Sequence, residues 1–488
     1  MTNSSPYVDE TLRTVVRRYR LTPLAIESAQ TPHLNPSTQL AIAIEQGRQT
    51  ITRGEKPSSM LQCVFVAALA QLIKDAMRPA SADPAFAMML LKHRFPNVNE
   101  YVALSSTARD DYQTIRKATN AIAHPGKLRH MTPGAQRDAL SGLHHCVSSS
   151  TWHTLDDTVL RLLDMPEVVG NASLNQGLKA LLESKALQRL RRIEVLETHE
   201  HVSDYRAMRD RYGPASKSAM AVSEGAISQQ RGAEVESLAA QACGALAERL
   251  NELEKNRMIY RTVTSMCVPR SMPGHPDRAK GEWDVVLLKR AHADPTDEWD
   301  ICLLIEAKAS IDAAATDFPR LLRGLRSLAK ADENVVYAFE TQQGIVRLRG
   351  ASLRALPTTD TRLAATVLYC SDASAENAPR LLGAASRMQL LSAHASLDYA
   401  SALARTGDAD SRILDVVWHD VLNAPRWHAV LNQYPTLSTV RELMVHPDDL
   451  LAAINRQETG DAQSTQARAP HAKHPPEIGP DTATGSSS

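Results

Sequence analysis

The 488-residue sequence lacks an excess of charge of either sign, because 55 basic residues are matched by 55 acidic ones. A chain-wide attraction to nucleic acid is therefore excluded, and any such binding must depend on a local basic surface. Aromatic residues are also scarce, at 4%. The hydrophobic share of 43% is ordinary for a soluble globular protein. At this length we expect two or three domains rather than one core.

Paired cysteines and long hydrophobic runs are missing as well. The longest apolar stretch, residues 60–73, is interrupted by Gln62 and Gln71 and is shorter than the roughly 18 to 20 residues of a membrane span. The N-terminus carries acidic residues and no apolar segment, so we expect no signal peptide. Six cysteines occur singly, which excludes a zinc site of paired cysteines and a disulfide scaffold, and they are Cys63, Cys146, Cys243, Cys267, Cys302 and Cys370. These absences predict a soluble cytoplasmic protein.

Composition and periodicity divide the chain into four consecutive regions. Residues 1–220 show apolar positions at helical spacing and predict a helical N-terminal region, which a polar linker from Gly213 to Gln230 follows. Residues 231–372 mix helical and strand patterns. Residues 376–456 predict a helical C-terminal extension, and residues 458–488 predict a disordered tail because they have no apolar periodicity.

The central region predicts an α/β domain of the mixed α+β kind. Helical patterns cover residues 231–256 and 311–331. Runs rich in β-branched and apolar residues predict the strands, at 258–268, 282–289, 299–308, 334–340, 345–349 and 363–370. This order favours a mixed β-sheet flanked by helices.

Two of these strands form a hairpin that brings acidic residues together. If the connection is centred near Asp294 and Pro295, antiparallel pairing places Asp284 opposite Glu306, and the alternation of side chains puts Lys308 on the same face. Opposed carboxylates repel each other, so a positive group must lie between them. Lys308 is one candidate, and a divalent cation such as Mg²⁺ or Mn²⁺, which prefers oxygen ligands, is the other.

The strand before the second acid is apolar throughout. Residues 301–305 (ICLLI) predict a strand buried on both faces, and Glu306, Ala307 and Lys308 follow it directly. Charges at the end of a buried strand lie at a sheet edge or a cleft floor, where an acid and a base with perturbed pKa values are useful for catalysis.

These residues resemble the PD-(D/E)xK nuclease superfamily, the restriction-endonuclease-like proteins. The resemblance rests on residues 281–284 (GEWD) followed by residues 305–308 (IEAK). Residues 231–239 (RGAEVESLA) are similar to the glycine and glutamate that begin the first core helix of several members. Glu236 is the better match for that glutamate, and Glu234 is the second choice. The resemblance covers residues 231 to about 372 and implies a restriction-endonuclease-like core.

The resemblance also implies a chemistry, an Mg²⁺-dependent endonuclease that hydrolyses phosphodiester bonds of DNA, with RNA left open as a substrate. Asp284 and Glu306 would hold Mg²⁺ or Mn²⁺, Lys308 would stabilise charge on the phosphate, and Glu236 would complete the catalytic set. Nucleases with one site often form homodimers to cut both strands, so a homodimer is a further expectation.

Plainer interpretations stand beside these expectations. The charges of the hairpin could simply pair with each other on a solvent-facing surface. A catalytically inactive nuclease fold could instead bind nucleic acid, or a protein partner through its helical flanks. Arg320, Arg323 and Arg326 recur at three-residue spacing and are candidates for contacting phosphates, although exposed helix faces often carry such residues.

Overall fold

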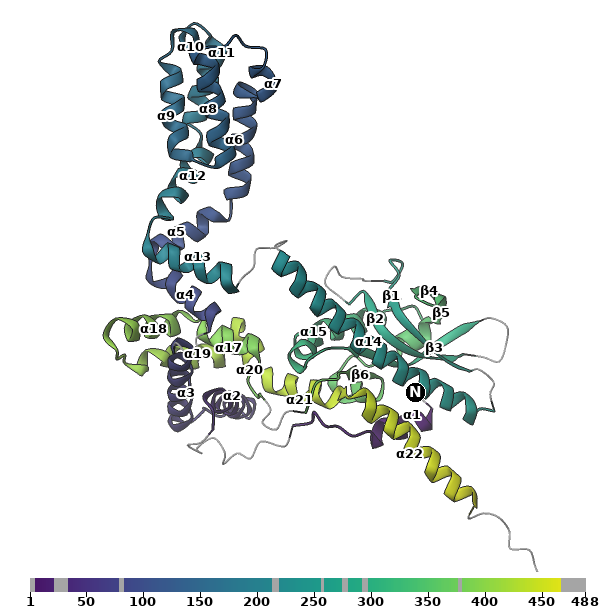
Figure 1. Cartoon of the computed structure of the whole chain (residues 1–488). Helices are drawn as coiled ribbons and strands as arrows, with labels where there is room; N and C mark the ends of the chain where they lie inside the picture. Colours follow the sequence, from purple (N-terminus) through teal and green to yellow (C-terminus); the bar gives the residue numbers. More distant parts are fainter. Residues whose placement is uncertain are drawn as a thin grey trace, which may run out of the picture. The chain divides into compact units, whose positions relative to one another are not determined.

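The computed structural model describes residues 5–21, 34–78, 83–212, 219–255, 259–273, 280–291, 297–375 and 380–466 (Figure 1). The chain forms two compact units. Unit 1 contains residues 1–23, 227–379 and 435–488, and unit 2 contains residues 24–226 and 380–434. Each unit is therefore built from segments that are far apart in the sequence, an interleaving that the four consecutive regions of the sequence did not anticipate.

Within unit 1, the helix predicted over 311–331 is confirmed at residues 311–328. The short helices at 350–354 and 360–365 were not predicted, and the second takes residues 363–365 from the predicted strand 363–370, which begins only at residue 367. The helix predicted over 231–256 begins earlier, at Ala219, so residues 219–230 are helical instead of forming a linker. Gly213 and Pro214 lie outside the described residues. The helical elements are α1 (Pro6–Thr14), α14 (Ala219–Leu253), α15 (Ile311–Leu328), α16 (Gly350–Arg354), η2 (Asp360–Ala365), α21 (Gln433–Leu443) and α22 (Pro447–Gln466).

Seven strands make one mixed sheet in unit 1, and five of them close into a small barrel. The strands are β1 (Tyr260–Cys267), β2 (Glu282–Arg290), β3 (Glu298–Ala307), β4 (Val336–Thr341), β5 (Gly344–Arg349), β6 (Val367–Cys370) and β7 (Met444–Val445). Their order is β2-β1-β4-β5-β3-β6-β7, and an additional β2–β3 pairing closes the ring. Strand β3 runs parallel to β5 and β6, whereas β1–β2, β2–β3 and β4–β5 are antiparallel. The predicted mixed α/β class is confirmed, but the closure of five strands was not predicted.

The β2–β3 hairpin has the predicted register at the end that carries the acids. Val285 pairs with Ile305 and Leu287 with Leu303, which is the register that places Asp284 beside Glu306. An irregularity after Leu287 shifts the pairing by one residue farther along the hairpin. Asp294 and Pro295, the expected centre of the connection, lie outside the described residues.

Two hydrophobic layers cover the strands. On one side α15 contributes Phe318, Leu321 and Leu325 to a cluster that includes Val286 and Leu304. On the other side α14 and α22 pack on a second cluster, which contains Val235, Leu246, Val285, Leu303, Ile305 and Leu450. Strand β3 is buried on both faces, as its apolar sequence predicted. Because Glu306 is two residues from Leu304, its side chain lies on the α15 side.

Unit 2 is helical in the part of the chain that the structure describes. It contains α2 (Pro36–Thr52), α3 (Ser59–Met77), α4 (Pro84–Arg94), α5 (Pro96–Ser105), α6 (Ala108–Ala123), α7 (Pro125–Leu128), α8 (Ala135–Ser149), α9 (Trp152–Leu163), α10 (Pro166–Val169), α11 (Ala172–Leu182), α12 (Lys185–Leu196), α13 (Glu200–Tyr212), α17 (Ala384–Leu391), α18 (His394–Thr406), η3 (Ser411–Leu414), α19 (Asp415–Asn423), η4 (Pro425–Trp427) and α20 (His428–Leu431). The predicted C-terminal extension is thus divided between the units, because α17 to α20 belong to unit 2 and α22 to unit 1.

One helix of unit 2, α3, is long and apolar enough to cross a membrane by length and composition alone. Half of its apolar window is buried within the protein, and it packs against α2, α18 and α19. This is typical of a core helix in a soluble protein.

The C-terminal helix α22 continues to Gln466, past residue 458, where the sequence predicted the start of a disordered tail. Residues 467–488, the rest of that tail, lie outside the described residues.

Candidate active site

Asp284 and Glu306 converge at the end of the β2–β3 hairpin and share a lysine. The Lys308 ammonium nitrogen lies 3.5 Å from Asp284 Oδ2 and 3.3 Å from Glu306 Oε2. The backbone N–H of Ala307 donates a hydrogen bond of 2.9 Å to Asp284 Oδ2. Both carboxylates therefore face the same small space, and a strand backbone fixes the position of one of them.

A second lysine, Lys280, was not predicted. It is 4% exposed, and its Nζ lies 2.5 Å from Glu306 Oε2 and 3.9 Å from Asp284 Oδ1. The sequence offered one signal, because Lys280 precedes Asp284 by four residues and so has the parity of a strand residue on the same face. Lys280 lies just before β2 rather than within it, which is why the strand pattern did not include it.

Glu306 is fully buried, and one of its oxygens has no partner. Oε2 contacts both lysines, whereas Oε1 is inaccessible to solvent and receives no hydrogen bond. Burial raises the pKa of Glu306 to about 8, and the nearby Asp284 carboxylate adds to the shift, while Lys280 and Lys308 oppose it. A buried acceptor without a donor is costly, so the environment of this oxygen disfavours the ionised carboxylate unless a positive group contacts it.

Lys308 is held as a cation by its surroundings. Burial lowers the pKa of Lys308, but the carboxylates of Glu306, Asp284 and Asp317 outweigh burial and raise it overall. Asp317, on α15, lies 4.0 Å from Lys308 and 3.3 Å from the Tyr369 hydroxyl of β6. Helix α15 therefore adds the carboxylate of Asp317 to the site, a residue that the sequence motif did not include.

The two candidate glutamates of α14 differ in their neighbours. Burial raises the pKa of Glu236, the Asp284 and Glu282 carboxylates raise it further, and Lys308 and Lys280 oppose them. Glu236 therefore lies within electrostatic reach of the site. Glu234 is exposed and pairs with Arg231 at 3.9 Å. Both glutamates are exposed and lie well inside α14 rather than at its start, and Glu236 is the one within electrostatic reach of the site.

The three arginines of α15 are exposed, as a binding surface requires. Arg320 is the one connected to the site, because its guanidinium lies 3.9 Å from Asp317 Oδ1. Residues at three-residue spacing drift around a helix, so Arg323 and Arg326 turn progressively away from the direction of Arg320.

Acidic groups outnumber lysines at this site. The carboxyl groups at the site are those of Glu236, Glu282, Asp284, Glu306 and Asp317. Lys280 and Lys308 oppose their effect on the pKa values of Glu236 and Glu306, and Arg320 pairs with Asp317. Carboxylate oxygens on adjacent strands and an unpartnered buried oxygen fit the ligand chemistry of Mg²⁺ or Mn²⁺. A cavity of 770 Å³ elsewhere in unit 1, lined in part by Arg13, Arg17 and Arg362, includes none of these groups. The charged groups of the candidate site therefore lie outside this cavity.

Comparisons with family models, with curated proteins and with solved structures give no significant match.

Proposed function

We propose that unit 1 is a metal-dependent nuclease of the PD-(D/E)xK type, with a restriction-endonuclease-like core, and that it hydrolyses phosphodiester bonds of DNA. The observation that carries this proposal is the convergence of Asp284 and Glu306, from adjacent strands, on one lysine ammonium beside a buried carboxylate oxygen without a partner. Charges that merely paired on a solvent-facing hairpin would not require a fully buried glutamate.

Each residue has a distinct role in this proposal. Asp284 and Glu306 are the residues that would hold Mg²⁺ or Mn²⁺, with Ala307 N–H fixing the Asp284 carboxylate. When bound, the cation supplies Lewis-acid polarisation of the phosphate and lowers the pKa of water. Lys308 donates hydrogen bonds to the attacking water or to a phosphate oxygen, where negative charge develops. Glu236 supports the site from α14 as a further acid.

The exposed arginines of α15 are the residues that would bind the phosphates of the DNA substrate. Arg320, next to Asp317 at the site, is positioned to contact the phosphate adjacent to the cleaved bond, and Arg323 and Arg326 would contact the backbone farther along. A homodimer would place two such sites on the two strands of a duplex. All six cysteines are free, which fits the proposed cytoplasmic location.

A second candidate function follows from Lys280. Its ammonium lies 2.5 Å from Glu306 and within reach of Asp284, so it could replace a cation permanently. The fold would then be catalytically inactive and would act as a scaffold that binds nucleic acid or a protein partner.

A cleavage assay separates the two candidates. Purified full-length protein is incubated with supercoiled plasmid with Mg²⁺, with Mn²⁺ or with a chelator, and nicked and linear products are measured. We expect metal-dependent cleavage that falls at least about a hundredfold in Lys308→Ala, because a charge-stabilising group is lost. His145→Ala, at an exposed histidine of α8 in unit 2, is the matched control and should cleave normally. No cleavage with either metal, or equal cleavage by Lys308→Ala, would support the scaffold.

A further inference from the structure

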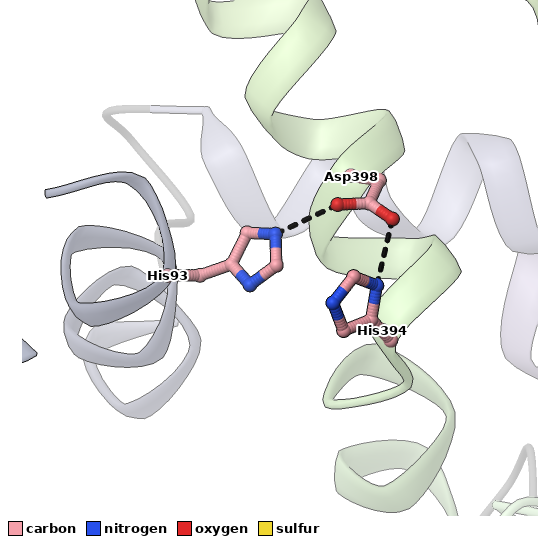
Figure 2. A group of neighbouring side chains, drawn as sticks. All are labelled: His93, His394 and Asp398. Atoms are coloured by element: carbon pink, nitrogen blue, oxygen red, sulfur yellow. Dashed lines mark hydrogen bonds and ion pairs between the residues drawn. The ribbon is translucent and has the colours of Figure 1, made fainter. Parts of the chain in front are cut away.

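Two histidines and an aspartate meet in unit 2, and His93 is about 300 residues before the other two in the chain (Figure 2). His93 lies in the last turn of α4, and His394 and Asp398 lie in the first turns of α18. His93 Nε2 is 2.8 Å from Asp398 Oδ1, and His394 Nδ1 is 2.8 Å from Asp398 Oδ2. Figure 2 shows the carboxylate between the two rings, with each oxygen directed at a different imidazole.

The three donor groups are close enough to share one ion. Their ligand atoms all lie within 4.8 Å of one another, and the two imidazole rings are 4.9 Å apart, edge to face. One cation bonded at about 2 Å to each ligand needs ligand atoms no more than about 4 Å apart, so small side-chain rotations must shorten the longest of these separations. His394 and Asp398 are four residues apart on α18, a spacing that places both on one helix face.

The chemistry of the donors differs from that of the Asp284 site. Two imidazole nitrogens and one carboxylate oxygen suit Zn²⁺ and other borderline transition metals, whereas Mg²⁺ prefers oxygen ligands alone. The group is also open to solvent, since the side chain of His394 is 82% exposed. His93 also lines a cavity of 360 Å³ together with Lys92 and Asn99.

We propose that His93, His394 and Asp398 bind a borderline divalent transition metal such as Zn²⁺. The metal links α4, from the first segment of unit 2, to α18, from the segment that returns to unit 2 after residue 379. Because it would bind the folded arrangement of two distant segments, it stabilises unit 2. This proposal does not depend on the nuclease activity of unit 1.

The test measures binding of the metal alone to the full-length chain, after removal of any purification tag. Zn²⁺ is titrated by calorimetry, Co²⁺ is followed by its visible absorption, and thermal unfolding is recorded with and without Zn²⁺. We expect one tight site, a tetrahedral Co²⁺ spectrum and a rise in the unfolding temperature of unit 2. His394→Ala and Asp398→Asn should each weaken Zn²⁺ binding at least tenfold and remove the thermal shift.

Two further variants keep the proposal falsifiable. His394→Cys retains a zinc-binding donor and should preserve the site, whereas His145→Ala, on the exposed face of α8, should bind Zn²⁺ as the parent does. His394→Cys and His145→Ala are compared with the parent by circular dichroism without metal to show that the fold is intact. Equal Zn²⁺ affinity and an equal thermal shift in the parent, His394→Ala and Asp398→Asn would overturn the proposal, and so would the absence of a tight site in the parent. Plasmid cleavage plays no part in either outcome.

Discussion

At the scale of single residues, Glu306 is a group whose burial lowers the stability of the folded protein. Its side chain has no exposed surface, and one oxygen lacks a hydrogen bond. A protein that only needed a stable sheet would have an apolar side chain here, because residues 301–305, which precede it in β3, are buried and apolar. A strongly perturbed acid in such a position is characteristic of functional sites, and its cost is measurable as a dependence of stability on pH.

We predict that the folded state of the metal-free protein loses stability as the pH rises from about 4.5 to about 8. The folded-state pKa of Glu306 is raised to about 8 from an ordinary value of 4.5. The folded state therefore retains a proton that the unfolded state releases, so the stability is fully present below pH 4.5 and is lost as the pH rises toward 8. The loss amounts to roughly a few kcal/mol, measured as the free energy of unfolding in denaturant at several pH values.

Glu306→Gln removes the ionisable group and should flatten this pH dependence while abolishing cleavage. The matched control is Glu234→Gln, because Glu234 is exposed and pairs only weakly with Arg231. If Glu306→Gln and Glu234→Gln showed the same pH dependence as the parent, Glu306 would not be the group whose titration sets that dependence.

At the scale of elements, the sequence predicted the hairpin better than its surroundings. Alternation and apolar runs set the ends of β2 and β3, and the register that brings Asp284 beside Glu306 followed from them. Lys280 and Asp317 could not be found in this way, because one precedes the strand and the other lies on α15. Their positions depend on how α15 packs over the sheet, which is a matter of tertiary contacts that a local pattern does not contain.

Gly324 is where α15 makes room for Lys280. A Cβ atom at this position would lie 2.8 Å from Lys280 Cβ and 3.3 Å from a ring carbon of Trp283. We predict that Gly324→Ala displaces Lys280 and α15, lowers the free energy of unfolding by about 1 to 3 kcal/mol and reduces cleavage. Denaturant unfolding and the plasmid assay measure the two effects.

Gly244→Ala is the matched control for this substitution. Gly244 lies within α14, and a Cβ there would meet no atom within 4 Å. Because alanine favours helix over glycine, we expect stabilisation by roughly 0.5 to 1 kcal/mol and unchanged cleavage. Similar effects of the two substitutions would show that the packing of α15 on Lys280 is not tight.

At the scale of the whole molecule, each unit is built from separate segments of the chain, and the sequence patterns did not predict this arrangement. Helical periodicity marked residues 1–220 and 376–456 as helical, but periodicity does not say which core a helix joins. The N-terminal segment completes unit 1. Arg18 forms paired hydrogen bonds of 2.6 Å with Asp449 of α22, and the Tyr19 hydroxyl lies 2.8 and 2.6 Å from the carbonyl oxygens of Ser371 and Ala373 after β6.

We predict that Tyr19→Phe destabilises unit 1 by about 1 to 3 kcal/mol, because the hydroxyl proton shared by the carbonyl oxygens of Ser371 and Ala373 is lost. Tyr19 is 1% exposed, and its hydroxyl bonds to the backbone after β6 rather than to a side chain of the proposed active site. The effect should appear in the thermal unfolding of unit 1, with cleavage preserved at low temperature. Tyr212→Phe, at a half-exposed tyrosine of unit 2, should leave the unfolding temperature unchanged. An unaltered unfolding temperature in Tyr19→Phe would mean that the N-terminal segment does not dock on unit 1.

The most direct test of the central claim is calorimetric titration of Mn²⁺ near neutral pH, in buffers that differ in ionisation enthalpy. Asp398→Asn serves as the background so that the histidine group of unit 2 does not contribute. Glu306, with its pKa raised to about 8, must lose a proton to bind a cation. We predict one bound Mn²⁺ with release of a proton, and binding at least tenfold weaker without that release in Glu306→Gln. Failure of the parent to bind Mn²⁺, or equal affinity in Glu306→Gln, would contradict the claim that Asp284 and Glu306 hold one cation.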